Sequence, residues 1–537
     1  MTDLWWQRGT IYQIYPRSFQ DSNDDGVGDL NGIYERLEYC TRLGVDALWL
    51  SPVYPSPMAD FGYDVSNYTD IHPLFGTLEE FDCLLAQIKR RGMKLIMDYV
   101  PNHTSDQHAW FADSRSDRTN ARRDWYLWRD AAPGGGPPNN WLSNFGGSAW
   151  EWDARTGQYY YHSFLKQQPD LNWRNPAVIA AMHDVLRFWL KRGVDGFRID
   201  VLWLLIKDDQ WRDNPPNPDF KAGMPAFHSQ LPTYTSDRPE MSGVVSGLRK
   251  VLDEFPDRVM IGEIYLSLDR LMAYYGERLG GVQMPFNFQL LQTAWDARSI
   301  AALIDRYEGA LPHGGWPNWV LGNHDNPRIA SRVGTPQGRV AAMMLLTLRG
   351  TPTLYYGDEI GMSNVAIPAD RVQDPFEKNV PGKGLGRDPC RTPMQWDRSQ
   401  HAGFSAGTPW LPLSDDYLVV NVDTEQHDHS SYLNLYRRLL ALRRSHAALS
   451  IGEYLPLLVK GELLAYIRSN GGERVLVALN LDHRPCSLPL KSLGLQGRAL
   501  LSTHLDREDE LISTALELRP NEGLIVALAA SRNPPPS

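Results

Sequence analysis

Short apolar runs alternate with longer amphipathic stretches along most of the chain. The runs are rich in β-branched and aromatic residues, which is typical of buried strands. Eight strands are predicted: Ile11 to Tyr15, Ala47 to Leu50, Leu95 to Val100, Gly196 to Asp200, Met260 to Ile264, Val282 to Phe286, Trp319 to Gly322 and Pro352 to Tyr356. Between most of them, segments such as Leu78 to Arg91 and Val178 to Lys191 carry apolar residues at helical spacing. This α/β alternation predicts a parallel sheet, and eight strands favour a closed (β/α)8 TIM barrel.

Two segments interrupt the alternation. Residues 103–173 are polar and aromatic and contain Gly134 to Gly136, which predicts a small B domain inserted after the third strand. Ser363 to Trp396 is a second Gly- and Pro-punctuated excursion, after the eighth strand. Both would leave the C-terminal face of the barrel, where active sites form in this architecture.

The remaining chain divides into two domains. Residues 1–102 and 174–446 are assigned to the catalytic barrel, which a helix from Tyr432 to Ser445 closes. Residues 447–537 contain short alternating strands such as Arg474 to Leu479, and they predict a C-terminal antiparallel β-sandwich.

Composition excludes several classes of protein. The net charge of −10 disfavours a nucleic-acid partner, because such proteins carry basic patches. The longest apolar run, Ala341 to Leu346, is far shorter than the ~20 residues of a membrane span. The start of the chain lacks signal-peptide features, and the four cysteines form no CxxC pair. We therefore predict a cytoplasmic protein without a membrane partner or an organic cofactor.

Carboxylates stand at the ends of three predicted strands. Asp200 ends the sequence GFRID, and Arg198 lies on the same face of that strand, where it would keep the carboxylate ionised. Glu263 has apolar neighbours, which would raise its pKa as a general acid requires. Asp325 follows the seventh strand. One Arg–Asp pair could be structural, but three converging carboxylates indicate glycoside hydrolysis.

Seven motifs resemble those of the α-amylase superfamily (glycoside hydrolase family 13), and within it the oligo-1,6-glucosidase and bacterial α-glucosidase group. In chain order they are DFGYDVSNY, DYVPNHTS, QPDLNW, GFRID, GEIY, LGNHDN and GRDPCRTPMQW. The resemblance implies that Asp200 is the nucleophile, Glu263 the acid/base and Asp325 the third carboxylate. It also implies that the first glucose is bound by the following residues: Tyr63, His103, Phe164, Gln168, Arg198 and His324.

The resemblance further implies an ion pair that closes the pocket behind the terminal glucose. Asp60 is one partner, and Arg391 is the predicted second partner, with Arg387 as another candidate in the same loop. A closed pocket predicts attack at chain ends, so short α-glucosides are the expected substrates. The residue after the nucleophile is Val201, which in similar enzymes accompanies α-1,6 activity, but the residues that follow it depart from that pattern. We therefore expect a broad substrate range that includes maltose and isomaltose, with trehalose and sucrose as further candidates. At high sugar concentration, transfer of glucose to a second sugar is expected.

Other enzymes share this scaffold. Trehalose synthases, sucrose isomerases and transglucosylases form the same glucosyl-enzyme intermediate and differ in what attacks it, so they remain the alternative. An inactive relative that serves as a transporter subunit would have a membrane span and lack the carboxylates, which is the reverse of this sequence.

An acidic loop predicts a structural Ca²⁺ or Mg²⁺. Residues 21–29 read DSNDDGVGD, which follows the first part of an EF-hand loop without its terminal Glu. An acidic turn without a metal is the alternative. Related glucosidases carry a cation here, and the resemblance implies these ligands: Asp21, Asn23, Asp25, the Val27 carbonyl and Asp29.

Overall fold

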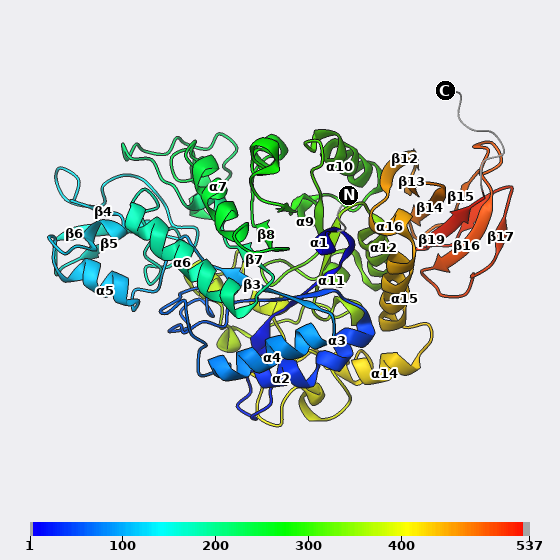
Figure 1. Ribbon diagram of the computed structural model, residues 1–537, viewed down its shortest axis with the longest axis horizontal. Helices are drawn as coiled ribbons and strands as arrows, with labels where there is room; N and C mark the ends of the chain where they lie inside the picture. The colour runs from blue at the N-terminus through cyan, green and yellow to red at the C-terminus, as the bar shows by residue number, and fades with distance from the viewer. Residues whose placement is uncertain (1–3, 530–537) are drawn as a thin grey trace.

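The computed structural model describes residues 4–529 and has a closed barrel of eight parallel strands at its centre (Figure 1). The strands neighbour one another in the order β1-β11-β10-β9-β8-β7-β3-β2. Their bounds are β1 (Ile11–Ile14), β2 (Ala47–Leu50), β3 (Lys94–Tyr99), β7 (Gly196–Ile199), β8 (Val259–Gly262), β9 (Met284–Asn287), β10 (Asn318–Val320) and β11 (Thr351–Tyr355). Each overlaps a predicted strand, so the predicted TIM barrel is confirmed.

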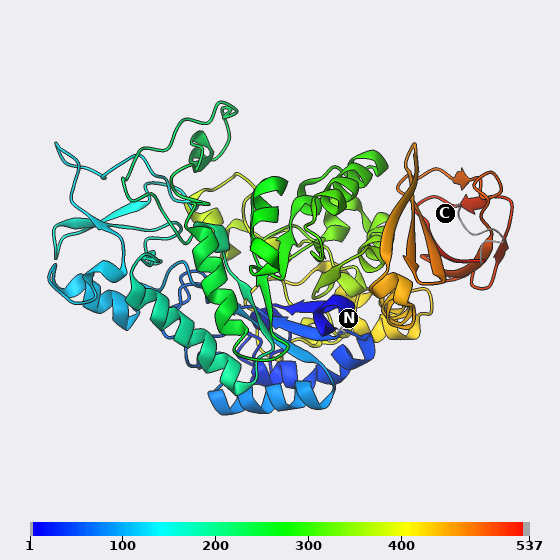
Figure 2. The same cartoon turned by 45° about the horizontal axis from the view of Figure 1, so that its top comes forward.

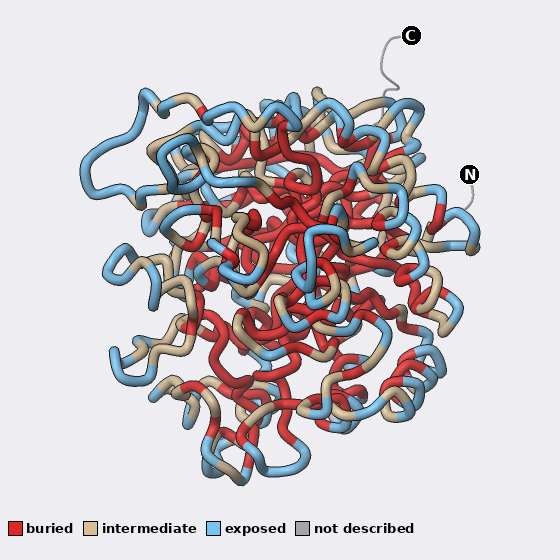
Figure 3. Tube along the Cα trace, turned by 90° about the vertical axis from the view of Figure 1, so that its left-hand side faces the viewer, coloured by how far each residue is buried: buried red, intermediate tan, exposed pale blue. Residues whose placement is uncertain are grey.

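Helices cover the outside of the barrel. Those that follow successive strands are α2 (Leu30–Glu35), α3 (Leu37–Leu43), α4 (Leu78–Arg90), α6 (Pro176–Arg192), α7 (Met241–Leu252), α8 (Leu268–Ala273), α10 (Ala297–Ala310), α12 (Thr335–Thr347) and α15 (Tyr432–Ser445). Every residue of β1, β2, β7 and β8 is buried, because helices cover one side and side chains fill the other. In Figure 3 the buried residues accordingly fill the centre, and exposed loops surround them.

An inserted domain follows β3. It contains α5 (Ala109–Ser116) and an antiparallel sheet of β4 (Trp128–Arg129), β5 (Trp150–Asp153) and β6 (Gln158–Tyr161), at the left of Figure 1. A further long segment, residues 205–240 between β7 and α7, was not predicted, and it extends upward beside this domain in Figure 2. Asn140 and Asn214 join the two by reciprocal hydrogen bonds of 2.8 and 2.9 Å. Together they form one wall above the barrel rim.

The C-terminal domain is antiparallel, as predicted. Its six-stranded sheet has the order β12-β13-β14-β19-β16-β17, and β15 pairs with β18 in a separate ribbon. The bounds are β12 (Glu453–Lys460), β13 (Leu463–Asn470), β14 (Glu473–Asn480), β15 (Cys486–Leu488), β16 (Gly497–Ser502), β17 (Leu511–Ile512), β18 (Leu516–Leu518) and β19 (Gly523–Leu528). The outermost parts of the predicted domains, residues 1–3 and 530–537, lie outside the described range. No helix within residues 4–529 is long and apolar enough to cross a membrane.

Candidate active site

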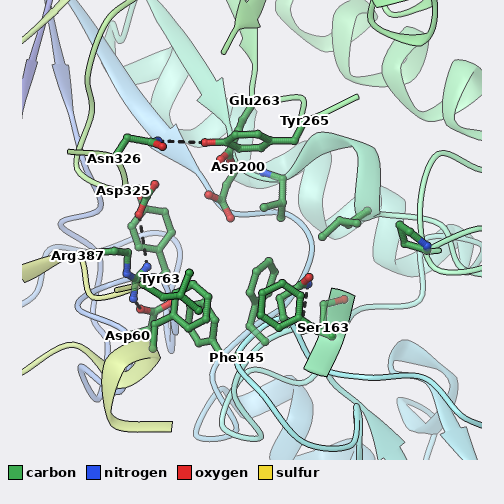
Figure 4. Close-up of a pocket in the computed structure, with 18 of the residues that line it drawn as sticks. Asp60, Tyr63, Phe145, Ser163, Asp200, Glu263, Tyr265, Asp325, Asn326 and Arg387 are labelled. Atoms are coloured by element: carbon green, nitrogen blue, oxygen red, sulfur yellow. Dashed lines mark hydrogen bonds and ion pairs between the residues drawn. The ribbon is translucent and has the colours of Figure 1, made fainter. Parts of the chain in front are cut away.

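The three predicted carboxylates face one pocket at the C-terminal rim of the barrel (Figure 4). Asp200 follows β7, Glu263 follows β8, and Asp325 lies just beyond β10. Because parallel strands in a closed barrel end at the same rim, residues far apart in the chain meet there. The pocket has a volume of about 620 Å³, which suits a small ligand more than a polymer.

Arg198 on β7 connects the carboxylates. Its Nη1 atom lies 2.6 Å from both Asp98 Oδ1 and Asp200 Oδ1, and its Nη2 atom lies 2.7 Å from Glu263 Oε2. The same Glu263 oxygen accepts a hydrogen bond of 2.8 Å from the Val201 amide. Val201 has φ of 39°, a strained value for a β-branched residue, and this conformation directs its amide toward Glu263. Asp200 and Glu263, the candidates for nucleophile and acid/base, therefore both bind the Arg198 guanidinium.

Burial changes the pKa values of the carboxylates around Arg198. Burial raises the pKa of Asp200 well above its usual value, and Arg198 opposes this rise without cancelling it. Burial likewise raises the pKa of Glu263, again against Arg198. Asp98, Asp200 and Glu263 share the Arg198 guanidinium, so the pKa of Asp200 depends on burial and on its carboxylate neighbours as well as on the predicted Arg198–Asp200 pair. A raised pKa on Glu263 is what an acid catalyst requires.

Asp325 has a different environment. Its Oδ1 lies 3.0 Å from Arg391 Nη2 and 3.4 Å from Arg387 Nη1, and its Oδ2 lies 3.2 Å from His324 Nε2. Burial opposes ionisation, but His324, Arg391 and Arg387 outweigh it and hold the pKa of Asp325 below its usual range. The pKa of Asp325 is therefore shifted in the opposite direction to those of Asp200 and Glu263. This difference suits it to bind hydroxyl groups rather than to transfer protons.

Four other predicted sugar-binding residues, Tyr63, His103, Phe164 and His324, line the same pocket, whereas Gln168 lies behind it. The Tyr63 hydroxyl lies 2.7 Å from His324 Nε2, and the two rings stack with centroids 5.4 Å apart. Gln168 Nε2 lies 3.2 Å from His103 Nε2, and the His103 ring packs edge-to-face against Phe164. Burial lowers the pKa of His103 to about 4, so this ring is neutral near pH 7.

Arg387, and not Arg391, is the ion-pair partner of Asp60. Arg387 Nη2 lies 2.7 Å from Asp60 Oδ1 (Figure 4) and also contacts Asp374 Oδ1 at 2.6 Å. Arg391 donates to the His324 carbonyl at 2.7 Å and to Asp325 instead. The prediction of an Asp60–Arg391 pair was therefore wrong, because a turn at residues 388–390 separates the two arginines and directs them to different carboxylates.

Several pocket residues were not predicted. Asp98 lies next to the pocket, on Arg198, and its place in the quoted motif DYVPNHTS could have suggested it. The aromatic wall could not have been found in this way. Phe145 comes from the inserted domain, whereas Trp203 and Tyr265 follow β7 and β8, with ring centroids 5.4 Å apart. No spacing in the sequence indicates that these residues share one cavity.

The acidic loop folds back on itself. Asp21 Oδ1 accepts hydrogen bonds from the amides of Asn23 and Asp24, and Asp29 caps α2 through the Gly32 amide. Burial raises the pKa of Asp25, and the charges of Asp21 and Asp29 add to the rise. Within the described residues, no group of three His, Cys, Asp or Glu side chains is arranged to hold a metal. The Asn23 amide and Val27 carbonyl would have to complete any coordination shell.

Comparison with known families decides the assignment. The alpha amylase catalytic domain matches residues 13–452 of the chain. The chain belongs to the α-amylase family. A probable α-glucosidase of Rhizobium meliloti is 43% identical over 94% of this chain and 95% of its own length. An oligo-1,6-glucosidase of Halalkalibacterium halodurans is 39% identical over 98% of this chain and 99% of its own length.

Solved structures of the family have the same fold as this α-amylase-family chain over nearly its whole length. An α-glucosyl transfer enzyme, XgtA, has a TM-score of 0.93 at 40% identity and covers 98% of this chain and 100% of its own. The trehalulose synthase MutB of Pseudomonas mesoacidophila has a TM-score of 0.90 at 36% identity and covers 98% of this chain and 99% of its own. This protein is therefore a glycoside hydrolase family enzyme, and the likeness includes both hydrolases and transfer enzymes.

Proposed function

We propose that this α-amylase-family enzyme is an exo-acting, retaining α-glucosidase of disaccharides and short oligosaccharides. The observation that carries the proposal is the buried Asp60–Arg387 ion pair, which joins the pocket wall to Asp325 through the 3.4 Å contact of Arg387. A substrate chain cannot continue past these charges, so one terminal glucose would fill the pocket. The names of the relatives, which are α-glucosidases and an oligo-1,6-glucosidase, support the same activity.

The proposed chemistry follows from the positions of the side chains. An Asp200 oxygen attacks the anomeric carbon while Glu263 donates its proton to the leaving oxygen, and a glucosyl ester of Asp200 forms. Glu263 then removes a proton from water, whose oxygen attacks the same carbon and releases Asp200. Two inversions give net retention. Arg198 stays in contact with both carboxylates and balances the charge that moves between them.

The stereochemistry and the mode of attack test the proposal together. Proton NMR of fresh maltose or isomaltose hydrolysate should show α-glucose as the first product. Soluble starch should lose little viscosity. β-Glucose as the first product would exclude the double displacement, and rapid thinning of starch into long fragments would exclude the closed pocket.

Transfer of glucose is the second candidate. The similarity to an α-glucosyl transfer enzyme and to a trehalulose synthase favours it specifically. In such reactions a sugar hydroxyl replaces water as the acceptor, and Glu263 would remove its proton instead. A panel of maltose, isomaltose, trehalose, sucrose and p-nitrophenyl α-glucoside, at low and high concentration, should separate hydrolysis from transfer through the ratio of free glucose to new oligosaccharides.

We further propose a structural Ca²⁺ or Mg²⁺ in the loop at residues 21–29. Hard oxygen donors of the kind that these cations prefer are present at Asp21, Asn23, Asp25, Val27 and Asp29. The bound ion would offset the repulsion between three neighbouring carboxylates, and it takes no part in the reaction. A cytoplasmic location also stays a prediction.

A further inference from the structure

Trp410 lies behind the glucose pocket, among residues that support the pocket wall. Its ring centroid is 5.2 Å from that of Phe61 and 6.3 Å from that of Tyr15, and the Arg17 guanidinium lies 4.7 Å above it. Its indole Nε1 donates a hydrogen bond of 3.0 Å to Ser18 Oγ. Within the described chain, none of these five residues lines the pocket itself. Their influence on a ligand would therefore be indirect.

Phe61 connects Trp410 to the closed end of the pocket. It directly follows Asp60, and its φ of 49° is a left-handed value that an aromatic residue adopts only when its surroundings enforce it. The Arg17 guanidinium, which contacts Trp410, also lies 5.0 Å from the centroid of the Phe61 ring. Trp410 and Arg17 thus hold Phe61 in the conformation that presents Asp60 to Arg387.

Tyr15 and Ser18 connect Trp410 to the groups around Asp325. The Tyr15 ring stacks on His324 with centroids 5.7 Å apart, and the Arg391 guanidinium lies 5.3 Å above the same Tyr15 ring. Ser18 Oγ donates a hydrogen bond to the Arg391 carbonyl. Removal of the indole would therefore free both a ring under His324 and the hydroxyl that fixes Arg391.

The segment that carries Trp410 is attached to the acidic loop. The Trp410 amide donates to the Gly26 carbonyl at 3.0 Å, and Ser405 Oγ donates to Asp21 Oδ2 at 2.6 Å. The approach is close enough that a Cβ on Gly26 would lie 2.0 Å from the Thr408 carbonyl oxygen. A change in the conformation of the loop must therefore move the 405–410 segment as well.

We propose that Trp410 is a positioning residue that holds the glucose-binding groups in place and couples their geometry to the loop at residues 21–29. The inference rests on the proposed glucosidase function, because it assumes that glucose occupies this pocket. A purely structural tryptophan would contribute to thermal stability only. A positioning tryptophan would also set the affinity for glucose while leaving Arg198, Asp200 and Glu263 undisturbed.

The first experiment compares Trp410→Ala, Trp410→Phe and the matched control Trp125→Ala. Like Trp410, Trp125 is half-buried beside an arginine and an aromatic ring, Arg122 and Trp110, and does not line the pocket. The inhibition constant of glucose and the kcat and KM for p-nitrophenyl α-glucoside are measured well below each variant's Tm. Trp410→Ala should raise the glucose inhibition constant and KM about tenfold or more, with a smaller change in kcat.

The controls separate positioning from stability. Trp410→Phe keeps an aromatic ring against Phe61 and should recover most of the affinity, whereas Trp125→Ala should lower Tm without changing the glucose inhibition constant. An unchanged constant in Trp410→Ala, or equal rises in Trp410→Ala and Trp125→Ala, would overturn the proposal. A wild-type enzyme that neither binds glucose nor hydrolyses the glucoside would instead refute the proposed function.

The second experiment tests the coupling to the loop. Gly26→Ala should weaken glucose binding in the wild type through its clash with Thr408, and it should add little in the Trp410→Ala background. Gly134→Ala is the control, because Gly134 also has a positive φ, of 95°, but has no atoms within 4 Å of the added Cβ. Full additivity of Gly26→Ala and Trp410→Ala, or no effect of Gly26→Ala on binding, would refute the coupling.

Discussion

Replacement of Asp60 and Arg387, singly and together, tests how the pocket is closed. In Asp60→Ala, Arg387 keeps the 2.6 Å contact with Asp374, so it retains a counter-charge. The expected loss is that of a charged hydrogen bond to the substrate, about 1.5–3 kcal/mol, which corresponds to roughly 10- to 150-fold in kcat/KM. Arg387→Ala is expected to be worse, about 3–5 kcal/mol, because it leaves both Asp60 and Asp374 buried without their partner.

The double mutant tests whether Asp60 and Arg387 interact energetically. If Asp60 and Arg387 act as a pair, the double mutant should lose less than the sum of the single mutants, by about 0.5–3 kcal/mol. The same cycle with Arg391, which contacts Asp325 and not Asp60, should give a coupling below about 0.5 kcal/mol. The assay is kcat/KM for maltose and p-nitrophenyl α-glucoside, with thermal unfolding to confirm folding. Strong Asp60–Arg391 coupling with none for Asp60–Arg387 would refute the geometry described above.

Three further predictions concern the chemistry and the loop. Asp200→Asn should reduce kcat by several orders of magnitude with an unchanged Tm, and more than about 10% residual activity would contradict its role as nucleophile. Glu263→Gln should impair maltose more than p-nitrophenyl α-glucoside in the glucosylation step, because a good leaving group needs less proton donation. Glu263 must also be protonated to act, so kcat/KM of the wild type should fall as pH rises through its raised pKa, and the variant should lose this alkaline limb. Chelation with EDTA should lower the Tm of the wild type, and added Ca²⁺ or Mg²⁺ should restore it. Asp21→Ala should abolish this dependence of Tm on the cation. An unchanged Tm in the wild type after chelation would count against a structural cation in the loop at residues 21–29.

The barrel and the position of the three candidate catalytic carboxylates follow from the sequence. Strand and helix periodicities are local properties. Each barrel strand is short and, apart from Lys94 at the start of β3, buried, so apolar runs of the right length are enough to locate all eight. Parallel strands end at a common rim, so residues such as Asp200 and Glu263, which end their strands, had to face one another. The motifs then indicate the chemistry that we propose for these carboxylates.

The pairing of the side chains, in contrast, depends on how distant loops pack together. Arg387 and Arg391 lie four residues apart in one irregular loop, and only the packed turn between them directs Arg387 to Asp60 and Arg391 to Asp325. The protonation of Asp200 likewise depends on burial and on the number of carboxylates around Arg198, which the adjacent sequence does not contain. The same holds for Trp410, which meets Phe61 and Tyr15 from the far end of the barrel domain. Periodicity along the chain indicates only which face of a helix or strand is buried. The pairings described here join side chains from different loops, and the spacing of such loops in the chain carries no information about their distance in space.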